Sequence, residues 1–205
     1  MQSYTTVKNS ASFEYEEKKS VFIADIAPVE HEADAISFIE KVKKKYPDAR
    51  HHVYAYVLRE NSVMRFSDDR EPQGTAGMPV LDVIRKRGCT DTVIVVTRYF
   101  GGTLLGTGGL VRAYTATAQG ALLLAEVITY DIYTTLELKV SYADYQKITA
   151  TLSDLGFRIA DTEFSDFVTI IGSIKSTSSE QLKSRLVEIT SGRAEITVIG
   201  EGFEY

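Results

Sequence analysis

The stretch that decides the fold runs from Val93 to Leu122 and reads VIVVTRYFGGTLLGTGGLVRAYTATAQGAL. Its first residues belong to the run from Thr92 to Thr97, which is β-branched and apolar and is typical of a buried strand. It continues into Leu110 to Val127, a long and mostly apolar segment that predicts the central helix of a domain. Between them, Gly101 to Gly109 holds five of the chain's 14 glycines in nine residues. A buried strand, a glycine-rich loop and a helix therefore follow one another directly.

The glycine-rich loop has the composition of an anion-binding site. Glycine permits positive φ and lets a ligand approach backbone N–H groups, while the N-terminus of the following helix adds unpaired donors and partial positive charge. Arg98 before the loop and Arg112 one turn into the helix supply guanidinium groups for a phosphate or carboxylate. Known nucleotide fingerprints do not fit, because Thr107-Gly108 replaces the P-loop Lys-Ser/Thr and Val111 replaces the third glycine of GxGxxG.

A purely structural role for these glycines is the alternative, in which they form a tight turn that lets the helix pack closely on the sheet. Aromatic residues beside the loop raise the same choice. The rings of Tyr99, Phe100 and Tyr114 offer stacking surfaces for bases, although single aromatics more often belong to a core. The candidate nucleic-acid or anion-binding residues are Arg98, Tyr99, Phe100, Gly101, Gly102, Gly106, Gly108, Gly109 and Arg112.

An acidic turn forms a second cluster, in the sequence FSDDREPQGTAG from Phe66 to Gly77. The carboxylates of Asp68, Asp69 and Glu71 have two interpretations, a Mg²⁺ site or caps for backbone N–H groups. Capping is favoured, because aspartate prefers turns and helix starts. These three residues and Thr75 are accessory candidates for the anion site, and no metal site is assigned.

His51 and His52 open a predicted strand, where alternation sends their side chains to opposite faces, so they cannot serve one site. His51 is kept as an accessory candidate. No serine or cysteine nucleophile motif accompanies it, and a packed or surface histidine is favoured over a catalytic one. We therefore assign no catalytic residue and no cofactor, and the residues favour a binding protein over an enzyme.

The order of predicted elements indicates two domains. The first contains a hairpin with a charged turn at Glu16 to Lys19, a helix from His31 to Tyr46, and a helix from Gly74 to Arg87. Composition breaks at Tyr130 to Thr134, and the pattern then restarts as strand, helix, strand, strand, helix, strand. That order is the ferredoxin-like βαββαβ unit. The predicted domains are residues 1–130 and 135–205.

Composition and charge exclude several classes of protein. Hydrophobic residues make up 44% of the 205 residues and the net charge is −5, which excludes a disordered chain and names no partner. The single cysteine, Cys89, cannot form an internal disulfide, and neither a signal peptide nor an apolar run long enough to cross a membrane is visible. These features predict a cytoplasmic protein without a membrane partner.

Charge is divided unevenly between the predicted domains. From residue 135 onward there are 7 Lys+Arg and 11 Asp+Glu, a net of −4, and the first 134 residues hold 16 and 17, a net of −1. The first domain is therefore the better candidate for contacting phosphate.

Two stretches resemble the IMPACT family and its bacterial YigZ-like members. They are DDREPQGTAGMPVL, from Asp68 to Leu81, and the stretch from Val93 to Leu122 quoted above. The resemblance covers most of residues 10–127, and the tail resembles a domain shared with the end of elongation factor G. It implies an α+β protein of two domains. The N-terminal domain is then of the left-handed βαβ type found in a small-subunit ribosomal protein, and the C-terminal domain is ferredoxin-like. Two departures are Arg70, where the family usually has glycine, and Gln73, where a small residue is common.

The resemblance also implies a function. Eukaryotic relatives regulate translation through protein binding in a stress pathway that bacteria lack. A bacterial-type member is therefore expected to be a non-enzymatic, translation-associated regulator that binds RNA or the ribosome through the glycine-rich loop. The alternatives are a Mg²⁺-dependent nucleotide-binding protein or enzyme that uses the same loop, and a protein–protein interaction module. Neither the partner nor the oligomeric state follows from the sequence.

Overall fold

The structure is a computed structural model that describes residues 2–205. The chain divides into two compact units, Tyr4–Thr129, and Tyr130–Tyr205 together with the described residues before Tyr4. The boundary falls inside strand β7 (Val127–Val140), so the composition break at 130–134 is not a loop. Strand continues there because Thr134 pairs with strands on both sides of β7, at Ile174 and Glu201.

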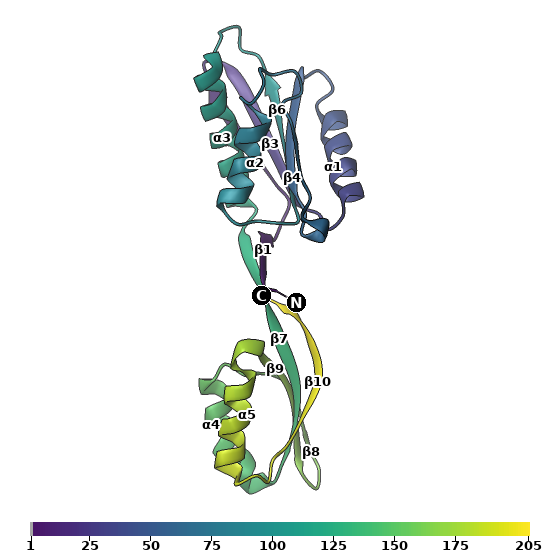
Figure 1. Cartoon of the computed structure of the whole chain (residues 1–205), viewed down its shortest axis with the longest axis vertical. Helices are drawn as coiled ribbons and strands as arrows, with labels where there is room; N and C mark the ends of the chain where they lie inside the picture. Colours follow the sequence, from purple (N-terminus) through teal and green to yellow (C-terminus); the bar gives the residue numbers. More distant parts are fainter. Residues whose placement is uncertain (1) are drawn as a thin grey trace. The chain divides into compact units, whose positions relative to one another are not determined.

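The first unit is built on a five-stranded antiparallel sheet in the order β2–β3–β6–β4–β5 (Figure 1). The strands of this unit are β1 (Tyr4–Val7), β2 (Ala11–Glu17), β3 (Ser20–Pro28), β4 (His51–Val57), β5 (Met64–Ser67) and β6 (Thr92–Tyr99). β6 lies at the centre and is buried along almost its whole length. This explains its continuous apolar sequence, because both of its faces are covered.

Helices cover both faces of this sheet. Helix α1 (Glu32–Lys45) lies on one face, and α2 (Gly77–Lys86) and α3 (Gly106–Leu124) lie on the other (Figure 1). Alternation along β6 divides the core accordingly: Val93 and Val95 pack with α1, whereas Ile94 and Val96 pack with α2 and α3. A short 3₁₀ turn, η1 (Glu60–Ser62), joins β4 to β5.

The sheet order requires one left-handed crossover. β3 and β4 are parallel and are connected through α1 across β6, while β5 and β6 are parallel and are connected through α2 across β4. Rotating the sheet by 180° about the axis normal to it brings the β3-to-β4 connection into the same direction as the β5-to-β6 connection. Two crossovers of equal handedness would therefore have their helices on the same face of the sheet. They lie on opposite faces, and one crossover is therefore left-handed, against the usual preference.

Helix α3 begins earlier than its sequence predicts. It starts at Gly106 rather than Leu110, so the last glycines of the loop form the first helical turn. Glycine is a poor helix former, which is why apolar periodicity alone placed the start later. The helix ends at Leu124, and Glu126 has φ of 58° just before β7 begins.

The N-terminal segment is held by the end of the same unit. The backbone N–H groups of Lys8 and Asn9 donate to the carbonyl groups of Glu126 and Ala125, at 2.8 and 3.0 Å. The hydroxyls of Thr5 and Thr129 are 3.0 Å apart. The first strand is thus held by residues that come more than a hundred positions later.

The second unit has the predicted ferredoxin-like order. After β7 come α4 (Tyr142–Asp154), β8 (Arg158–Phe164), β9 (Val168–Lys175), α5 (Ser176–Thr190) and β10 (Glu195–Glu204). Its four strands are antiparallel in the order β10–β7–β9–β8, and both helices lie on one face (Figure 1). Strand β1 also pairs with β7. The α+β class with two domains is thereby confirmed. In residues 2–205, no helix is long and apolar enough to cross a membrane.

Candidate functional site

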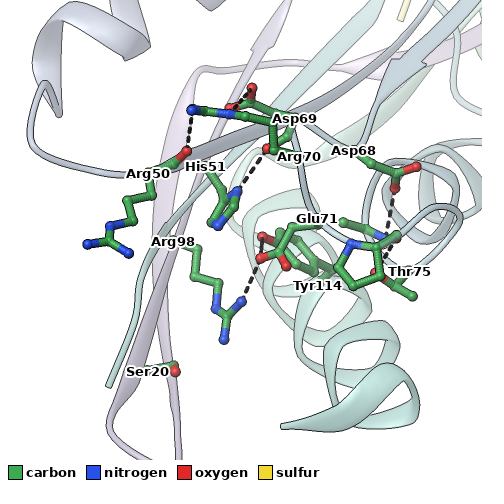
Figure 2. A network of polar contacts seen from close by, with 12 residues as sticks. Ser20, Arg50, His51, Asp68, Asp69, Arg70, Glu71, Thr75, Arg98 and Tyr114 are labelled. Carbon is green, nitrogen blue, oxygen red and sulfur yellow. Dashed lines mark hydrogen bonds and ion pairs between the residues drawn. The ribbon is translucent and has the colours of Figure 1, made fainter. Parts of the chain in front are cut away.

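Most candidate residues lie at one end of the first sheet, where β6 ends and β4 begins (Figure 2). The register pairs Arg98 of β6 with His51 on one side and with Phe22 of β3 on the other. The acidic turn follows β5 and returns past this end before α2 starts. The glycine-rich loop leaves β6 from the same end, so the fold brings together segments far apart in the sequence.

Asp68 caps the start of helix α2, as the favoured interpretation of the acidic turn predicts. One carboxylate oxygen accepts hydrogen bonds from the N–H groups of Ala76 and Gly77 at 3.1 and 2.7 Å, and the other accepts from Gly74 at 2.9 Å. These donors would otherwise lack partners, because α2 has no side-chain cap at Ala76. The charge of Asp68 also suits the positive end of the helix dipole.

Asp69 and His51 fix the acidic turn to the start of β4. The Asp69 carboxylate accepts from the N–H of His52 at 2.6 Å, and its carbonyl oxygen lies 2.8 Å from Nδ1 of His51. A carbonyl can only accept, so Nδ1 of His51 carries the proton in this hydrogen bond. Arg70 has φ of 69° and donates to the Arg50 carbonyl at 2.7 Å. A positive φ is the backbone conformation that glycine adopts at no steric cost, and here an arginine holds it.

Glu71 lies in a buried polar network. Its Oε1 atom accepts from Nη1 of Arg98 at 2.7 Å and from the hydroxyl of Tyr114 at 2.8 Å (Figure 2). Arg98 is 6% exposed, Glu71 8% and Tyr114 0%. Burial raises the pKa of the Tyr114 phenol far above its usual value, with the Glu71 carboxylate adding to the effect, so Tyr114 stays a donor. Within residues 2–205, Nε of Arg98 has no hydrogen-bond partner.

These contacts change the interpretation of three candidates. Nη1 of Arg98 is held in an internal ion pair, because Glu71 reaches it from the acidic turn, and Nε is left as the donor without an acceptor among residues 2–205. Tyr114 is a core residue and cannot stack on a base. Thr75 is buried and donates its hydroxyl to the Pro72 carbonyl at 2.6 Å, so it stabilises the turn.

The three carboxylates of the acidic turn do not converge on a metal. Asp68, Asp69 and Glu71 each bind different partners, namely helix N–H groups, a strand N–H group, and the Arg98–Tyr114 pair. No group of three or more potential metal ligands occurs among residues 2–205. The three carboxylates therefore act within the protein, as caps of backbone N–H groups and as one half of an ion pair.

The loop glycines divide into those that the fold requires and one that it does not. A Cβ on Gly101 would lie 2.0 Å from the carbonyl carbon of Lys19, so close packing requires glycine there. Gly102 and Gly106 have φ of 84° and 72°, and a Cβ on Gly109 would lie 3.0 Å from the Leu105 side chain. The structural explanation therefore accounts for these four positions.

Gly108 is the exception. It lies in the first turn of α3, has no positive φ, and is exposed. The nearest atom to a Cβ built there would be Nη1 of Arg112, at 3.5 Å. Glycine at a helical position is less stable than alanine by about 0.5–1 kcal/mol, and no contact in the structure explains its presence.

Arg112 points back toward the start of α3 and is exposed. No ion pair or hydrogen bond to its side chain is found among residues 2–205. The hydrogen bond to Glu17 raises the pKa of Tyr15, and Arg112 opposes that rise, so its charge acts near β2. Arg112 is therefore the available cation beside the uncapped first turn of α3, which also lacks acidic residues.

The remaining candidates, Tyr99 and Phe100, differ in exposure. Phe100 is 49% exposed at the beginning of the loop and lies 5.6 Å from the Arg98 guanidinium carbon. Tyr99 pairs with Val21 and points to the opposite face from Arg98. Phe100 is therefore the aromatic residue of this set that offers a ring beside the glycines.

Sequence reasoning did not identify Lys18 and Lys19 as neighbours of the loop. They are the two turn residues between β2 and β3, and the carbonyl of Lys19 packs against Gly101. The hairpin itself was expected, with a charged turn at this point. Its position beside a loop some 80 residues later depends on β3 pairing with β6, which local patterns do not show.

Family models match both units. Residues 18–122 match the Impact N-terminal domain, and residues 138–193 match a domain of unknown function, DUF1949. The chain is 35% identical to the IMPACT family member YvyE of Bacillus subtilis over 96% of its length and 91% of that protein. It is 33% identical to YigZ of Escherichia coli, over 90% and 92%.

More distant and structural similarities agree with this. Protein IMPACT of Xenopus laevis is 32% identical over 44% of this chain and 30% of its own length. A crystal structure described as that of an hypothetical protein aligns with a TM-score of 0.61, at 32% identity and 98% coverage of both chains. The similarity therefore extends through both units.

Proposed function

Since this chain belongs to the IMPACT family and has the two-domain organisation of YvyE and YigZ, we propose that it is a non-enzymatic, translation-associated protein that binds RNA. The RNA surface of the ribosome is included in this class. The binding surface is the exposed first turn of α3, with Arg112 beside it and Phe100 at the other end of the loop. Phosphate oxygens accept hydrogen bonds from the backbone N–H groups of this turn and from the Arg112 guanidinium, and a base stacks on the ring of Phe100.

The observation that carries this proposal is the pairing of Gly108 with Arg112. Gly108 is the loop glycine that neither backbone conformation nor packing requires. A missing side chain in an exposed helical turn leaves room for a ligand close to the backbone N–H groups. The guanidinium of Arg112, which has no ion-pair partner in the described residues, lies at this same position and suits an oxyanion better than an apolar or cationic partner.

The internal pairs strengthen the electrostatic case. The three carboxylates of the acidic turn are engaged by N–H groups or by Arg98, which limits their repulsion of a phosphate. The net charge of −5 describes the whole chain and not this surface, so it underestimates how well this surface can bind a phosphate.

Fluorescence anisotropy with a labelled RNA hairpin at two salt concentrations tests the proposal. We expect Arg112→Gln to weaken binding by about 1.5–3 kcal/mol without lowering the melting temperature. Gly108→Ala should weaken binding while stabilising the helix, so loss of folding cannot explain the result. Arg65→Gln, an exposed arginine on β5 at the opposite edge of the sheet, is the matched control. Binding that is absent, or insensitive to salt and to both site variants, would remove the proposal.

A further inference from the structure

The turn between β2 and β3 places two lysines in an unusual backbone conformation. Glu17 pairs with Ser20, which leaves Lys18 and Lys19 as a two-residue turn with φ of 48° and 65°. Positive φ at both positions is the signature of a type I′ turn, in which Asn-Gly is strongly preferred. Lysine has a Cβ that is strained in this region, so local stability does not account for its presence at either position.

This turn adjoins the glycine-rich loop. Gly101 packs against the carbonyl group of Lys19, and its N–H donates to the Ser20 hydroxyl at 3.1 Å. Both lysine side chains are exposed, and neither has an ion-pair partner among residues 2–205. Backbone contacts therefore hold against the loop a turn whose two lysines have no ion-pair partner in the described part of the chain.

A buried donor lies behind this contact. In Figure 2 the Arg98 side chain extends from β6 to Glu71, and its strand partner Phe22 follows two positions after Ser20. Arg98 is 6% exposed, and its Nε has no acceptor within the described part of the chain. Buried N–H groups without an acceptor are rare in folded proteins, and one explanation is an acceptor supplied from outside the chain. Phe100 lies over this guanidinium and is half exposed.

We propose that the Lys18–Lys19 turn is the second half of the RNA site, and that its ammonium groups bind phosphates adjacent to the phosphate on the α3 turn. The inference rests on the proposed RNA-binding function and names further residues of the same site. It explains why a strained turn carries lysine: the charges are needed where the hairpin meets the loop, and the fold tolerates the strain. Single-stranded RNA is the favoured form, because the half-exposed ring of Phe100 at the start of the loop offers a stacking surface for a base.

Two double variants separate charge from strain. K18N/K19G removes both charges and supplies the residues that the turn prefers, whereas K18Q/K19Q removes both charges and keeps the strain. We expect both to weaken binding of a labelled single-stranded RNA at least roughly tenfold. Each should also reduce the slope of log K against log salt by about 1.4, or about 0.7 per lost phosphate contact. K18N/K19G should at the same time melt a few degrees above wild type.

The control removes two charges elsewhere in the same unit. Lys41→Gln combined with Lys44→Gln changes exposed lysines on α1, which covers the other face of the sheet, and should leave affinity nearly unchanged. If K18N/K19G and K18Q/K19Q bind like wild type while Arg112→Gln binds weakly, the inference is wrong and the proposed function stands. If wild type shows no salt-dependent binding, the proposed function fails and the inference fails with it.

Discussion

Replacing Arg98 by methionine tests the buried network at the centre of the site. The Glu71 carboxylate is 8% exposed, and its Oε1 accepts from both Arg98 and Tyr114. In Arg98→Met the Tyr114 hydroxyl is the one of these two donors that remains. Removing one partner of a buried ion pair lowers stability by about 3–5 kcal/mol, because the other charge stays desolvated and uncompensated. With a urea dependence near 2 kcal/mol per M, this shifts the unfolding midpoint of the first unit down by roughly 2 M.

The double variant supplies the decisive comparison. Glutamine at position 71 is uncharged and still accepts from Tyr114, so Arg98→Met combined with Glu71→Gln should recover most of the lost stability. Tyr114→Phe removes one hydrogen bond to a charged acceptor and should lower stability by about 1.5–3 kcal/mol.

Urea unfolding followed by far-UV circular dichroism suits this chain, which has no tryptophan. Arg65→Met, on an exposed part of β5, is the control and should stay within about 0.5 kcal/mol of wild type. A loss below about 1 kcal/mol for Arg98→Met, or a double variant as unstable as the single one, would refute the argument that Glu71 needs Arg98.

Three further predictions concern the turns and the second unit. Gly101→Ala should abolish the native packing of the hairpin, since its Cβ would lie 2.0 Å from backbone; retention of the wild-type melting temperature would contradict this. Asp68→Ala should lower stability by about 1–2 kcal/mol through loss of the α2 cap, measured by urea unfolding, with an unchanged midpoint as the contrary result. Asp144, whose pKa is held below its usual value by hydrogen bonds from Arg193 and Ser141, stabilises the second unit above about pH 4 and loses this effect as pH falls further. Asp144→Asn should therefore flatten the melting temperature of that unit between neutral and acid pH, and an unchanged acid dependence would show that another group controls it.

Local patterns in the sequence were sufficient for most of the fold. Apolar spacing located α1, and β-branched runs located β4 and β6 because each signal lies within a few residues. The order of elements after residue 134 was enough to predict the ferredoxin-like unit. The left-handed crossover came instead from the family resemblance, because handedness depends on which face each helix covers.

The site was predicted only where its chemistry is local. The glycine cluster and Arg112 stood out from spacing, and Asp68 capping followed from the turn composition. The sequence analysis predicted that Arg98 contacts a ligand. Its actual partner, Glu71, lies 27 residues earlier in the chain, and no periodicity in the sequence links the two residues. Lys18 and Lys19 were overlooked for the same reason, since strand pairing, and not sequence distance, places them beside Gly101.

The attachment of the N-terminal segment to the end of the first unit sets an order for folding during synthesis. Thr5 and Thr129 are 124 positions apart. The backbone N–H groups of Lys8 and Asn9 donate to the carbonyl groups of residues 126 and 125, which are also made late. At about 5–20 residues per second, the first strand remains without these partners for roughly 6–25 s after it is made. By then the strands that form the central sheet have already been translated. The N–H of Thr90 already donates to the Thr5 carbonyl at 2.8 Å, so a ribosome that stalls before residue 125 holds a domain whose first strand is attached at residue 90 and still lacks its contacts with residues 125–129.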